Sequence, residues 1–367
     1  AGEAPALPIG LPAVEEPRVL LQGLDAVLGR LAATLPVLVQ RRLTGEPAGL
    51  TAVDAPAWTA GTARLPLAVR SASFATGSLL SKVRGRIDRM LARAPHWQLA
   101  WRRRMPGTSR IPAEIISRRD YRTLPDDGRR YFGDPFGLVV DGETHVLCEE
   151  LSYATMKGVI SAFTIRADGT SGPTRVVLER PHHLSYPQLF RRDGAIFMMP
   201  ESAAGNALEI HRAIEFPTRW ELVAQPMLGQ FHDATLYDDG SRLWITAAVA
   251  DRRASTWDTL AVFHATRPEG PWTPLATNPV LIDARRARPA GELFTEGGRL
   301  YRPVQDCSGG YGGALAVCEV TRLDEAGFAQ VERRHTRFAV AERTLGPHTL
   351  NVAGDYELID LLGPRST

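Results

Sequence analysis

Short apolar runs that alternate with polar residues fill the chain after residue 104, and they are paired around tight turns. In the first pair, the run that follows Asp134 reverses at Asp141-Gly142 and returns through Leu147. An Asp-Gly pair between two apolar runs is a strong signal for a β-hairpin. Helical periodicity is nearly absent from this part of the chain, so the pattern predicts an all-β body.

This hairpin recurs along the chain, and its copies are anchored at residues 134, 186, 233, 290 and 348. Further apolar runs, such as residues 158–165, follow the hairpins and supply outer strands. A self-similar unit of about fifty residues built from strands is typical of the blades of a β-propeller, each with about four strands. We therefore predict a five-bladed β-propeller.

The first part of the chain has a different pattern. Residues 19–43 place leucine and valine at helical spacing, whereas residues 44–73 are rich in Pro, Gly, Ala and Thr and predict a loop. A basic amphipathic helix is predicted near residues 78–93. We interpret residues 1–95 as a partly helical extension and residues 96–367 as the propeller.

Two segments of this first part have more specific interpretations. Residues 97–101 alternate like a strand, and a propeller is often closed by a strand from the other end of the chain, so this segment is expected to complete the fifth blade. The helix near residues 78–93 could contact an anionic membrane surface or an acidic partner. The plainer alternative is a helix packed on the propeller with a solvated basic face.

Composition narrows the class of protein. The formal net charge is +2, which gives no reason to expect a nucleic-acid partner. The three cysteines, Cys148, Cys307 and Cys318, form no CxxC pair and argue against a disulfide framework or a zinc site. The histidines are too dispersed for a metal motif. We therefore expect neither a metal nor an organic cofactor.

The sequence also bears on location. The nearest approach to a membrane span, residues 19–39, is interrupted by Asp25, Arg30 and Pro36. No signal peptide is recognisable, and the missing initiator Met indicates a fragment or a processed product. The odd number of cysteines favours a reducing compartment. We expect a cytoplasmic protein, with peripheral membrane contact as an alternative.

Polar residues at the starts of the innermost strands should converge on the axis of a propeller, together with residues at the ends of the returning strands. Carboxylates brought there from separate blades suit acid–base chemistry at a glycosidic bond, which needs one ionised carboxyl and one protonated carboxyl. The catalytic candidates are Asp134, Glu201 and Asp233. The substrate-binding candidates are Glu149, Glu150, His183, Tyr186, His232, Arg288, Glu292, Arg302, Gln305, Asp306, Tyr311, His348 and Asn351.

Structural alternatives exist for several candidates. Asp134 could cap a turn before Pro135, and Glu201 could be a surface residue at a strand end. Arg288 and Arg302 could pair with the acids, or could hold a substrate carboxylate or phosphate in a bidentate fork. Since strand neighbours alternate between faces, only one of Glu149 and Glu150 should face the funnel.

The motifs at these positions resemble one known family. They are Gly133-Asp134-Pro135-Phe136, 183–187, 196–202, 233–236, 288–291, 300–308 and 348–351. Together they resemble the five-bladed propeller domain at the N-terminus of plant glucosamine inositolphosphorylceramide transferase. Bacterial proteins also carry this domain, sometimes behind a formyltransferase-like domain. The resemblance covers about residues 97–360.

This family is similar in fold to the superfamily of arabinanase, levansucrase and invertase, which includes glycoside hydrolase family 43. The resemblance implies an acidic base or nucleophile at Asp134 and a second acid that modulates pKa at Asp233. It also implies a proton donor at Glu201 or Glu292, of which we prefer Glu201. The transferase activity of the plant protein is usually ascribed to a C-terminal domain outside the matching region.

The sequence thus predicts a carbohydrate-active propeller that hydrolyses or transfers a glycosyl unit of a glycan or glycoconjugate. The first alternative is a non-catalytic module that binds a glycan or a lipid headgroup beside a separate enzyme domain. The second is a scaffold for partner proteins, which is a common role of propellers. The resemblance adds an upstream formyltransferase-like domain as an expected partner.

Overall fold

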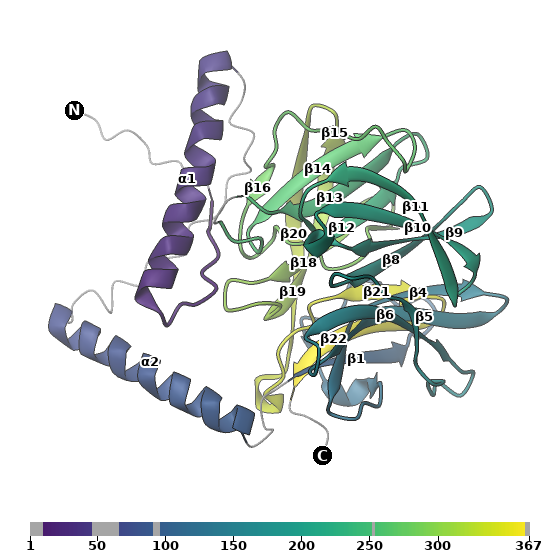
Figure 1. The fold of residues 1–367 in the computed structure, drawn as a ribbon, viewed down its shortest axis with the longest axis horizontal. Coiled ribbons are helices and arrows are strands. Elements are labelled where there is room, and N and C mark those ends of the chain that lie inside the picture. Colours follow the sequence, from purple (N-terminus) through teal and green to yellow (C-terminus); the bar gives the residue numbers. More distant parts are fainter. Residues whose placement is uncertain (1–9, 46–65, 91–95, 252–253, 364–367) are drawn as a thin grey trace.

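The computed structural model describes residues 10–45, 66–90, 96–251 and 254–363. Five antiparallel sheets stand around one axis and form a five-bladed β-propeller, as the hairpin repeat predicts (Figure 1). In each of the first three sheets the innermost strand comes first in the chain. The first blade consists of β4 (Arg130–Val140), β5 (Glu143–Ser152), β6 (Lys157–Ile165) and β7 (Arg175–Leu178). The second consists of β8 (Ser185–Arg192), β9 (Ala195–Glu201), β10 (Ala207–Glu215) and β11 (Arg219–Leu228).

The third and fourth blades each carry one extra short strand. The third consists of β12 (Phe231–Asp238), β13 (Leu243–Val249), β14 (Thr259–Ala265) and β15 (Thr273–Pro274), with β16 (Leu281–Ile282) also paired to β14. The fourth consists of β17 (Phe294–Glu296), β18 (Arg299–Asp306), β19 (Ala314–Asp324), β20 (Gly327–Phe338) and a parallel edge strand, β2 (Ile115–Ile116). Single 3₁₀ turns are η2 (Arg118–Asp120), η3 (Ala203–Gly205) and η4 (Val340–Glu342).

The fifth blade joins the two ends of the propeller. Its inner strands, β21 (Leu350–Ala353) and β22 (Tyr356–Gly363), come from the end of the chain. The strand β1 (His96–Arg103) pairs with β22 along its whole length and carries the short edge strand β3 (Arg122–Thr123) on its other side. The prediction that residues 97–101 close this blade is therefore confirmed.

The hydrophobic core is divided among the contacts between neighbouring blades. Leu147 and Met198 belong to one cluster between the first and second blades, and Leu99 and Val146 belong to another between the fifth and first. Three further clusters join the remaining neighbours. Each blade presents apolar side chains on both faces, which explains why the sequence shows continuous apolar runs in the middle strands.

A β-bulge at the start of the innermost strand repeats in the first three blades. The residues inside it are Asp134 (φ 50°), Tyr186 (φ 45°) and Asp233 (φ 49°), all in the left-handed region. Residues other than glycine adopt this conformation rarely, and it concentrates at functional sites. Because a bulge re-aims a side chain, this repeated distortion directs one large polar side chain per blade toward the axis.

Two helices lie outside the propeller, on one side of it (Figure 1). The helix α1 (Leu20–Thr44) matches the helix predicted at residues 19–43, and Pro36 lies within it. By length and composition alone, α1 is long and apolar enough to cross a membrane. The helix α2 (Leu67–Met90) begins earlier than expected, so the loop prediction was wrong for residues 67–73. Residues 46–65 and 91–93, which the loop and helix predictions also included, lie outside the described residues.

Candidate active site

A buried triad of ionisable groups lies where the first and fifth blades meet. His348 lies between two carboxyls, with Nε2 at 3.3 Å from Asp134 Oδ1 and Nδ1 at 2.6 Å from Asp360 Oδ2. Thr349 Oγ1 donates a further hydrogen bond to Asp134 Oδ1 (2.9 Å). Only 4% of Asp134 is exposed. The inner end of the first blade is thus tied to the loop that precedes β21.

In this triad one imidazole, that of His348, faces two carboxyls. The pKa values of Asp134 and His348 are both shifted as a result. Burial raises the pKa of Asp134 well above its ordinary value; His348 opposes this shift, and Asp360 adds to it. Burial by itself would lower the pKa of His348, but the charges of Asp360 and Asp134 outweigh it and raise that pKa to about 9. The raised pKa of Asp134 favours its protonated form, which reduces the negative charge buried beside His348.

Asp360 also orders the backbone around the triad. Its Oδ2 accepts from the N–H of Asp134 (2.8 Å), and its Oδ1 accepts from the N–H groups of His348 (3.2 Å) and Thr349 (2.9 Å). Asp360 is not among the residues that the sequence analysis selected. The available signal was a single charged residue inside the apolar run 358–362 of β22.

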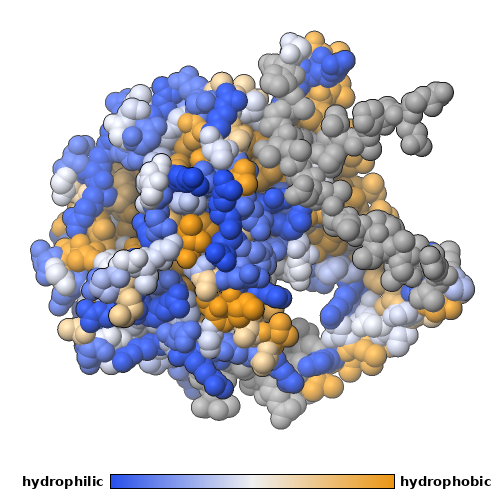
Figure 2. Space-filling view, turned by 180° about the vertical axis from the view of Figure 1, so that it is seen from behind, coloured by the Kyte–Doolittle hydropathy of each residue, from blue (hydrophilic) through white to orange (hydrophobic). Residues whose placement is uncertain are grey.

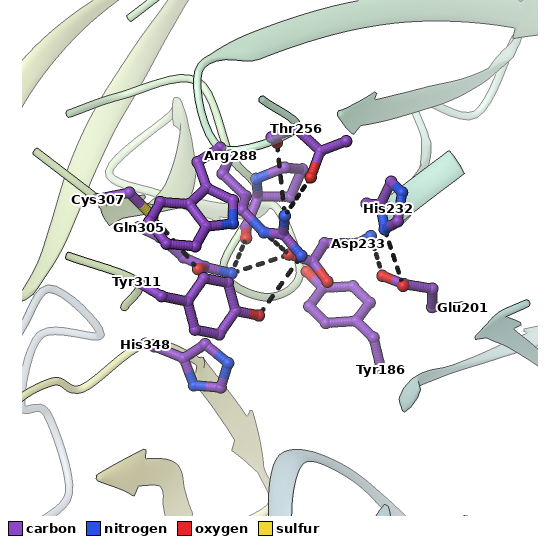
Figure 3. Close-up of polar contacts among 12 residues, drawn as sticks. Tyr186, Glu201, His232, Asp233, Thr256, Arg288, Gln305, Cys307, Tyr311 and His348 are labelled. Atoms are coloured by element: carbon purple, nitrogen blue, oxygen red, sulfur yellow. Dashed lines mark hydrogen bonds and ion pairs between the residues drawn. The ribbon is translucent and has the colours of Figure 1, made fainter. Parts of the chain in front are cut away.

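The third blade contributes a second buried carboxyl. Asp233 Oδ2 accepts from Arg288 Nε (2.6 Å) and from Gln305 Nε2 (2.8 Å). Burial raises the pKa of Asp233 to about 6, against the opposing charge of Arg288 and with the added effect of Glu201. Arg288 is itself buried, and its guanidinium lies 5.0 Å from the ring centre of Tyr311. Figure 3 shows these side chains converging.

Glu201 lies beside Asp233, but its pKa is shifted in the opposite direction. Its Oε1 is 3.0 Å from His232 Nδ1, and its Oε2 accepts from the N–H of Asp233 (2.9 Å). Burial opposes ionisation, but the hydrogen bond and charge of His232, helped by Arg288, lower the pKa of Glu201 to about 2. A proton donor needs a raised pKa. The environment of Glu201 is therefore that of a base, not of the acid that the sequence analysis preferred.

Tyr311 lies close to the buried carboxyls of all three blades. Burial raises the pKa of its hydroxyl, and the charges of Asp233, Asp134 and Glu201 all act on it. Its ring lies 6.2 Å from that of Trp97, 5.3 Å from that of Trp257 and 5.4 Å from that of His348. The two tryptophans were not among the sequence candidates, and they are partly exposed. Together these rings make an aromatic wall beside the buried carboxyls.

Glu149 and Glu150 divide between the two faces of β5, as strand alternation predicts. Glu149 Oε1 contacts His183 Nε2 (3.1 Å) and accepts from the hydroxyl of Tyr131 (3.1 Å). Its charge also contributes to raising the pKa of Asp134. Burial would lower the pKa of His183, but Glu149 outweighs it and raises that pKa. Glu149 and His183 are thus on the funnel side.

Glu150 is directed away from this cluster. Its Oε1 accepts from Arg130 (2.5 Å), and its Oε2 accepts from the hydroxyl of Ser161 (2.6 Å) on the neighbouring strand β6. Both oxygens have partners within the blade, so the assignment of Glu150 to substrate binding does not fit the structure.

Several other sequence candidates are structural supports. Arg302 is fully buried and donates to the carbonyl oxygens of Arg286 and Ala287, on the loop that leads to Arg288. Burial lowers the pKa of Arg302 to about 10. Asp306 pairs with His335 on β20 (2.9 Å). The terminal nitrogens of Arg302 and the carboxyl of Asp306 thus have partners within the protein.

Tyr186 and Asn351 connect neighbouring blades through buried hydrogen bonds. The hydroxyl of Tyr186 lies 2.8 Å from Thr235 Oγ1 and accepts from the N–H of Gly291 (2.6 Å), while Asn351 Nδ2 donates to the carbonyl oxygen of Pro135 (2.8 Å). A Cβ at position 291 would lie 2.1 Å from the carbonyl oxygen of Leu350, so only glycine fits there. These residues form a floor that joins the blades.

Glu292, the other candidate donor, has a suitable pKa but a different location. Burial raises this pKa to about 7, and the one charge that opposes the shift is that of Arg110. Arg110 belongs to the loop before β2, and its N–H binds Glu296 at the end of β17 (2.8 Å). Glu292 therefore faces the contact with that loop, and not the groups around Tyr311.

Asp134, His348 and Asp360 each offer a ligand atom within 4.8 Å of one another, which is a spacing that a metal ion could use. A metal binds neutral imidazole, however, whereas the two carboxyls raise the pKa of His348 to about 9. His348 already neutralises the charge that a cation would neutralise. We therefore interpret the cluster as an ion triad.

Thermal stability should fall as the pH rises from about 7 to about 9.5. The folded state binds the His348 proton more tightly than the unfolded chain, because this pKa is raised from 6.5 to about 9. The resulting stabilisation is fully present below pH 6.5 and is lost as the pH passes about 9. Differential scanning fluorimetry across this range should show that His348→Gln flattens the slope. An equal slope in both proteins would contradict this account.

The fold and this funnel define a class of protein, the five-bladed β-propellers with buried carboxyls at the axis. Within this class, the chain belongs to the family described as glucosamine inositolphosphorylceramide transferase 1, N-terminal, whose model matches residues 124–356. The chain is 32% identical over 207 residues to glucosamine inositolphosphorylceramide transferase 1 of Arabidopsis thaliana. It is 31% identical over 210 residues to the protein of the same name in Oryza sativa subsp. japonica.

These matches cover 55% of this chain but only 27% and 28% of the two plant proteins, so the chain spans about a quarter of their length. Solved structures with a similar chain path include a β-xylosidase, with a TM-score of 0.43 and 10% identity over 65% of this chain and 96% of that one. A GH43_1 enzyme from Xanthomonas citri in complex with xylose has a TM-score of 0.45 and 10% identity over 65% of this chain and 88% of that one.

Proposed function

We propose that the chain binds a saccharide or glycoconjugate in the central funnel and acts on its glycosidic bond. The observation that carries this proposal is a set of carboxyls from three blades with opposite pKa shifts around one tyrosine hydroxyl. The pKa values of Asp134 and Asp233 are raised, and that of Glu201 is lowered. Two carboxyls with pKa values pushed apart are what general acid and general base roles require.

The proposed roles reverse those that the sequence suggested. Asp134, with its raised pKa, gives a proton to the leaving glycosidic oxygen as the bond to the anomeric carbon breaks. Glu201 takes a proton from water or from an acceptor hydroxyl, whose oxygen forms the new bond. Asp233 holds Glu201 through its backbone N–H and keeps Arg288 in place through its carboxyl. Water as the acceptor gives hydrolysis, and a sugar or lipid hydroxyl gives transfer.

The aromatic wall is the proposed binding surface for the sugar ring. Apolar faces of sugars pack on aromatic rings, and Trp97 and Tyr311 lie edge to face beside the buried carboxyls. The name of the plant relatives includes glucosamine and inositolphosphorylceramide. An amino sugar or an inositol phosphate headgroup is accordingly the substrate class that we propose to test first.

Removal of the Tyr311 ring should weaken binding. We expect Tyr311→Ala to reduce affinity for a responsive saccharide by about 2- to 12-fold, because an aromatic ring contact contributes about 0.5–1.5 kcal/mol. Tyr311→Phe, which keeps the ring, should retain most of the affinity. Isothermal titration calorimetry with glucosamine, myo-inositol phosphate and xylose measures both variants. Equal losses in the two variants would exclude stacking as the cause.

A non-catalytic binding module is the second candidate function. It is favoured by the close cationic partners of the acids, since Arg288 binds Asp233 and His232 binds Glu201. It is also favoured because the chain matches only 27% of the length of the plant relative. Such a module would bind the headgroup for a separate enzyme domain. The upstream formyltransferase-like partner and the cytoplasmic location remain predictions.

A further inference from the structure

The helix α1 packs against the propeller with its polar side. Arg30 NH2 contacts Asp258 Oδ1 (2.6 Å) and donates to the carbonyl oxygen of Ser255 (2.5 Å). Arg41, eleven residues further along the helix, donates to the carbonyl oxygen of Asn278 (2.6 Å). Only 5% of Arg30 and 3% of Arg41 are exposed, and Asp258 is fully buried. The side that a surface helix usually presents to water is the side that α1 buries.

The opposite side of α1 is apolar and exposed. Leucines at spacings of three and four residues form a continuous stripe, and Leu21 is 76% exposed. An amphipathic helix of a water-soluble domain buries such a stripe, so this one requires a partner surface. The stripe consists of Leu20, Leu21, Leu24, Leu28, Leu31, Leu35, Val39 and Leu43.

The helix α2 continues this surface and adds positive charge. Its exposed apolar residues include Leu79 and Leu80 (64% each), with Val83 and Ile87 one and two turns further along. The span 67–90 contains five basic residues and one acid, a formal net charge of +4. Figure 2, seen from behind, shows hydrophobic surface on both helices beside the propeller. An apolar stripe with basic flanks is the pattern of a helix that lies in a membrane interface.

A groove along α2, bordered by the residue Arg18 that precedes α1, gathers arginine and serine side chains. Arg18 lies just before α1; its side chain donates to the hydroxyl of Ser81, and its carbonyl oxygen accepts from the hydroxyl of Ser78 (2.6 Å). Arg70 and Arg84 of α2 line the same groove. Three guanidinium groups beside exposed leucines fit the phosphates of lipid headgroups.

We propose that α1 and α2 bind the surface of an anionic lipid bilayer. Their leucines enter the boundary between headgroups and acyl chains, and Arg18, Arg70 and Arg84 contact the phosphates. The charge of α2 selects a bilayer over a second copy of this chain, because two copies of a helix of net charge +4 repel each other. Crossing the bilayer would separate Arg30 from Asp258, so the helix lies on the membrane.

Vesicle flotation with the whole chain tests this proposal. We expect the protein to float with vesicles of phosphatidylcholine and phosphatidylglycerol, to float at least tenfold less with phosphatidylcholine alone, and to be released by high salt. Arg70→Glu/Arg84→Glu should abolish flotation with the anionic vesicles. The matched double variant Arg175→Glu/Arg219→Glu, on exposed edges of the first two blades, should float like the wild type.

The apolar contribution needs its own variant. Leu21→Gln/Leu28→Gln removes two leucines from the exposed stripe without touching the Arg30 anchor, and it should reduce flotation several-fold while the melting temperature stays unchanged. Equal flotation with anionic and neutral vesicles would overturn the proposal. The absence of flotation with either kind of vesicle would also overturn it. A stable dimer in light scattering that Leu21→Gln/Leu28→Gln dissociates would show that a second copy covers the stripe instead.

Discussion

Asp134→Asn is expected to abolish turnover while leaving the folded propeller intact. The amide cannot give up a proton at neutral pH, and loss of a general acid costs about 10²- to 10⁴-fold in rate. Asn tolerates the left-handed conformation (φ 50°) of this position, and its carbonyl oxygen can still accept from Thr349. The measurement is product release from a panel of 4-nitrophenyl glycosides and glycosylated inositol phosphates, followed by titration of the responsive saccharide.

Asp141→Asn is the matched control for this variant. Asp141 lies on the same hairpin, has the same left-handed φ of 50°, and is exposed at the turn. It should keep full activity and affinity. If Asp134→Asn turns over substrate at the wild-type rate, Asp134 is not the donor. If the wild type binds a saccharide but converts none of the panel, the binding-module function replaces the catalytic one.

Asp360→Ala is expected to cause the largest loss of stability. The carboxyl is fully buried and faces His348, and it accepts from three backbone N–H groups, including that of Asp134 in the first blade. Removal of one partner of a buried pair costs about 3–5 kcal/mol, because the remaining charge is left uncompensated. Urea denaturation followed by tryptophan fluorescence gives the change in the free energy of unfolding.

Asp355→Ala serves as the control, since Asp355 lies in the turn of the same β21–β22 hairpin and its ion pair with Arg103 is exposed. Exposed pairs contribute about 0–1 kcal/mol, so this variant should unfold almost like the wild type. Similar losses in the two variants would mean that Asp360 does not carry the contact between the first and last blades. If Asp360→Ala fails to fold, Asp360→Asn, which keeps one acceptor oxygen, should be intermediate.

The two expected results probe different properties of one cluster. Asp134 and Asp360 contact the same imidazole of His348, yet only Asp134 is assigned to the reaction. Loss of turnover with normal stability is the result expected for the proton donor, and loss of stability is the result expected for the residue that joins the blades. The membrane proposal is independent of both, because α1 and α2 meet neither residue and their variants leave the funnel unchanged.

The propeller could be predicted from the sequence because the patterns that indicate it are local. Alternation along a strand and an Asp-Gly turn depend on neighbouring residues, and five repeats of them fixed the number of blades. The closing role of β1 followed from the same alternation. The start of α2 was missed because residues 67–77 are rich in alanine, serine and glycine, a composition that fits a loop as well as a helix.

The tertiary structure alone decided which partners surround each candidate site residue. The sequence predicted that Asp134, Asp233 and Glu201 converge on one axis. The charge of each side chain, however, depends on a partner from another part of the chain. His348 lies 214 residues after Asp134, and His232 lies 31 residues after Glu201. Such distant pairs set the desolvation and Coulomb energies that raise one pKa and lower another. For the same reason only the fold could show that Arg302 supports a loop and that α1 turns its leucines outward.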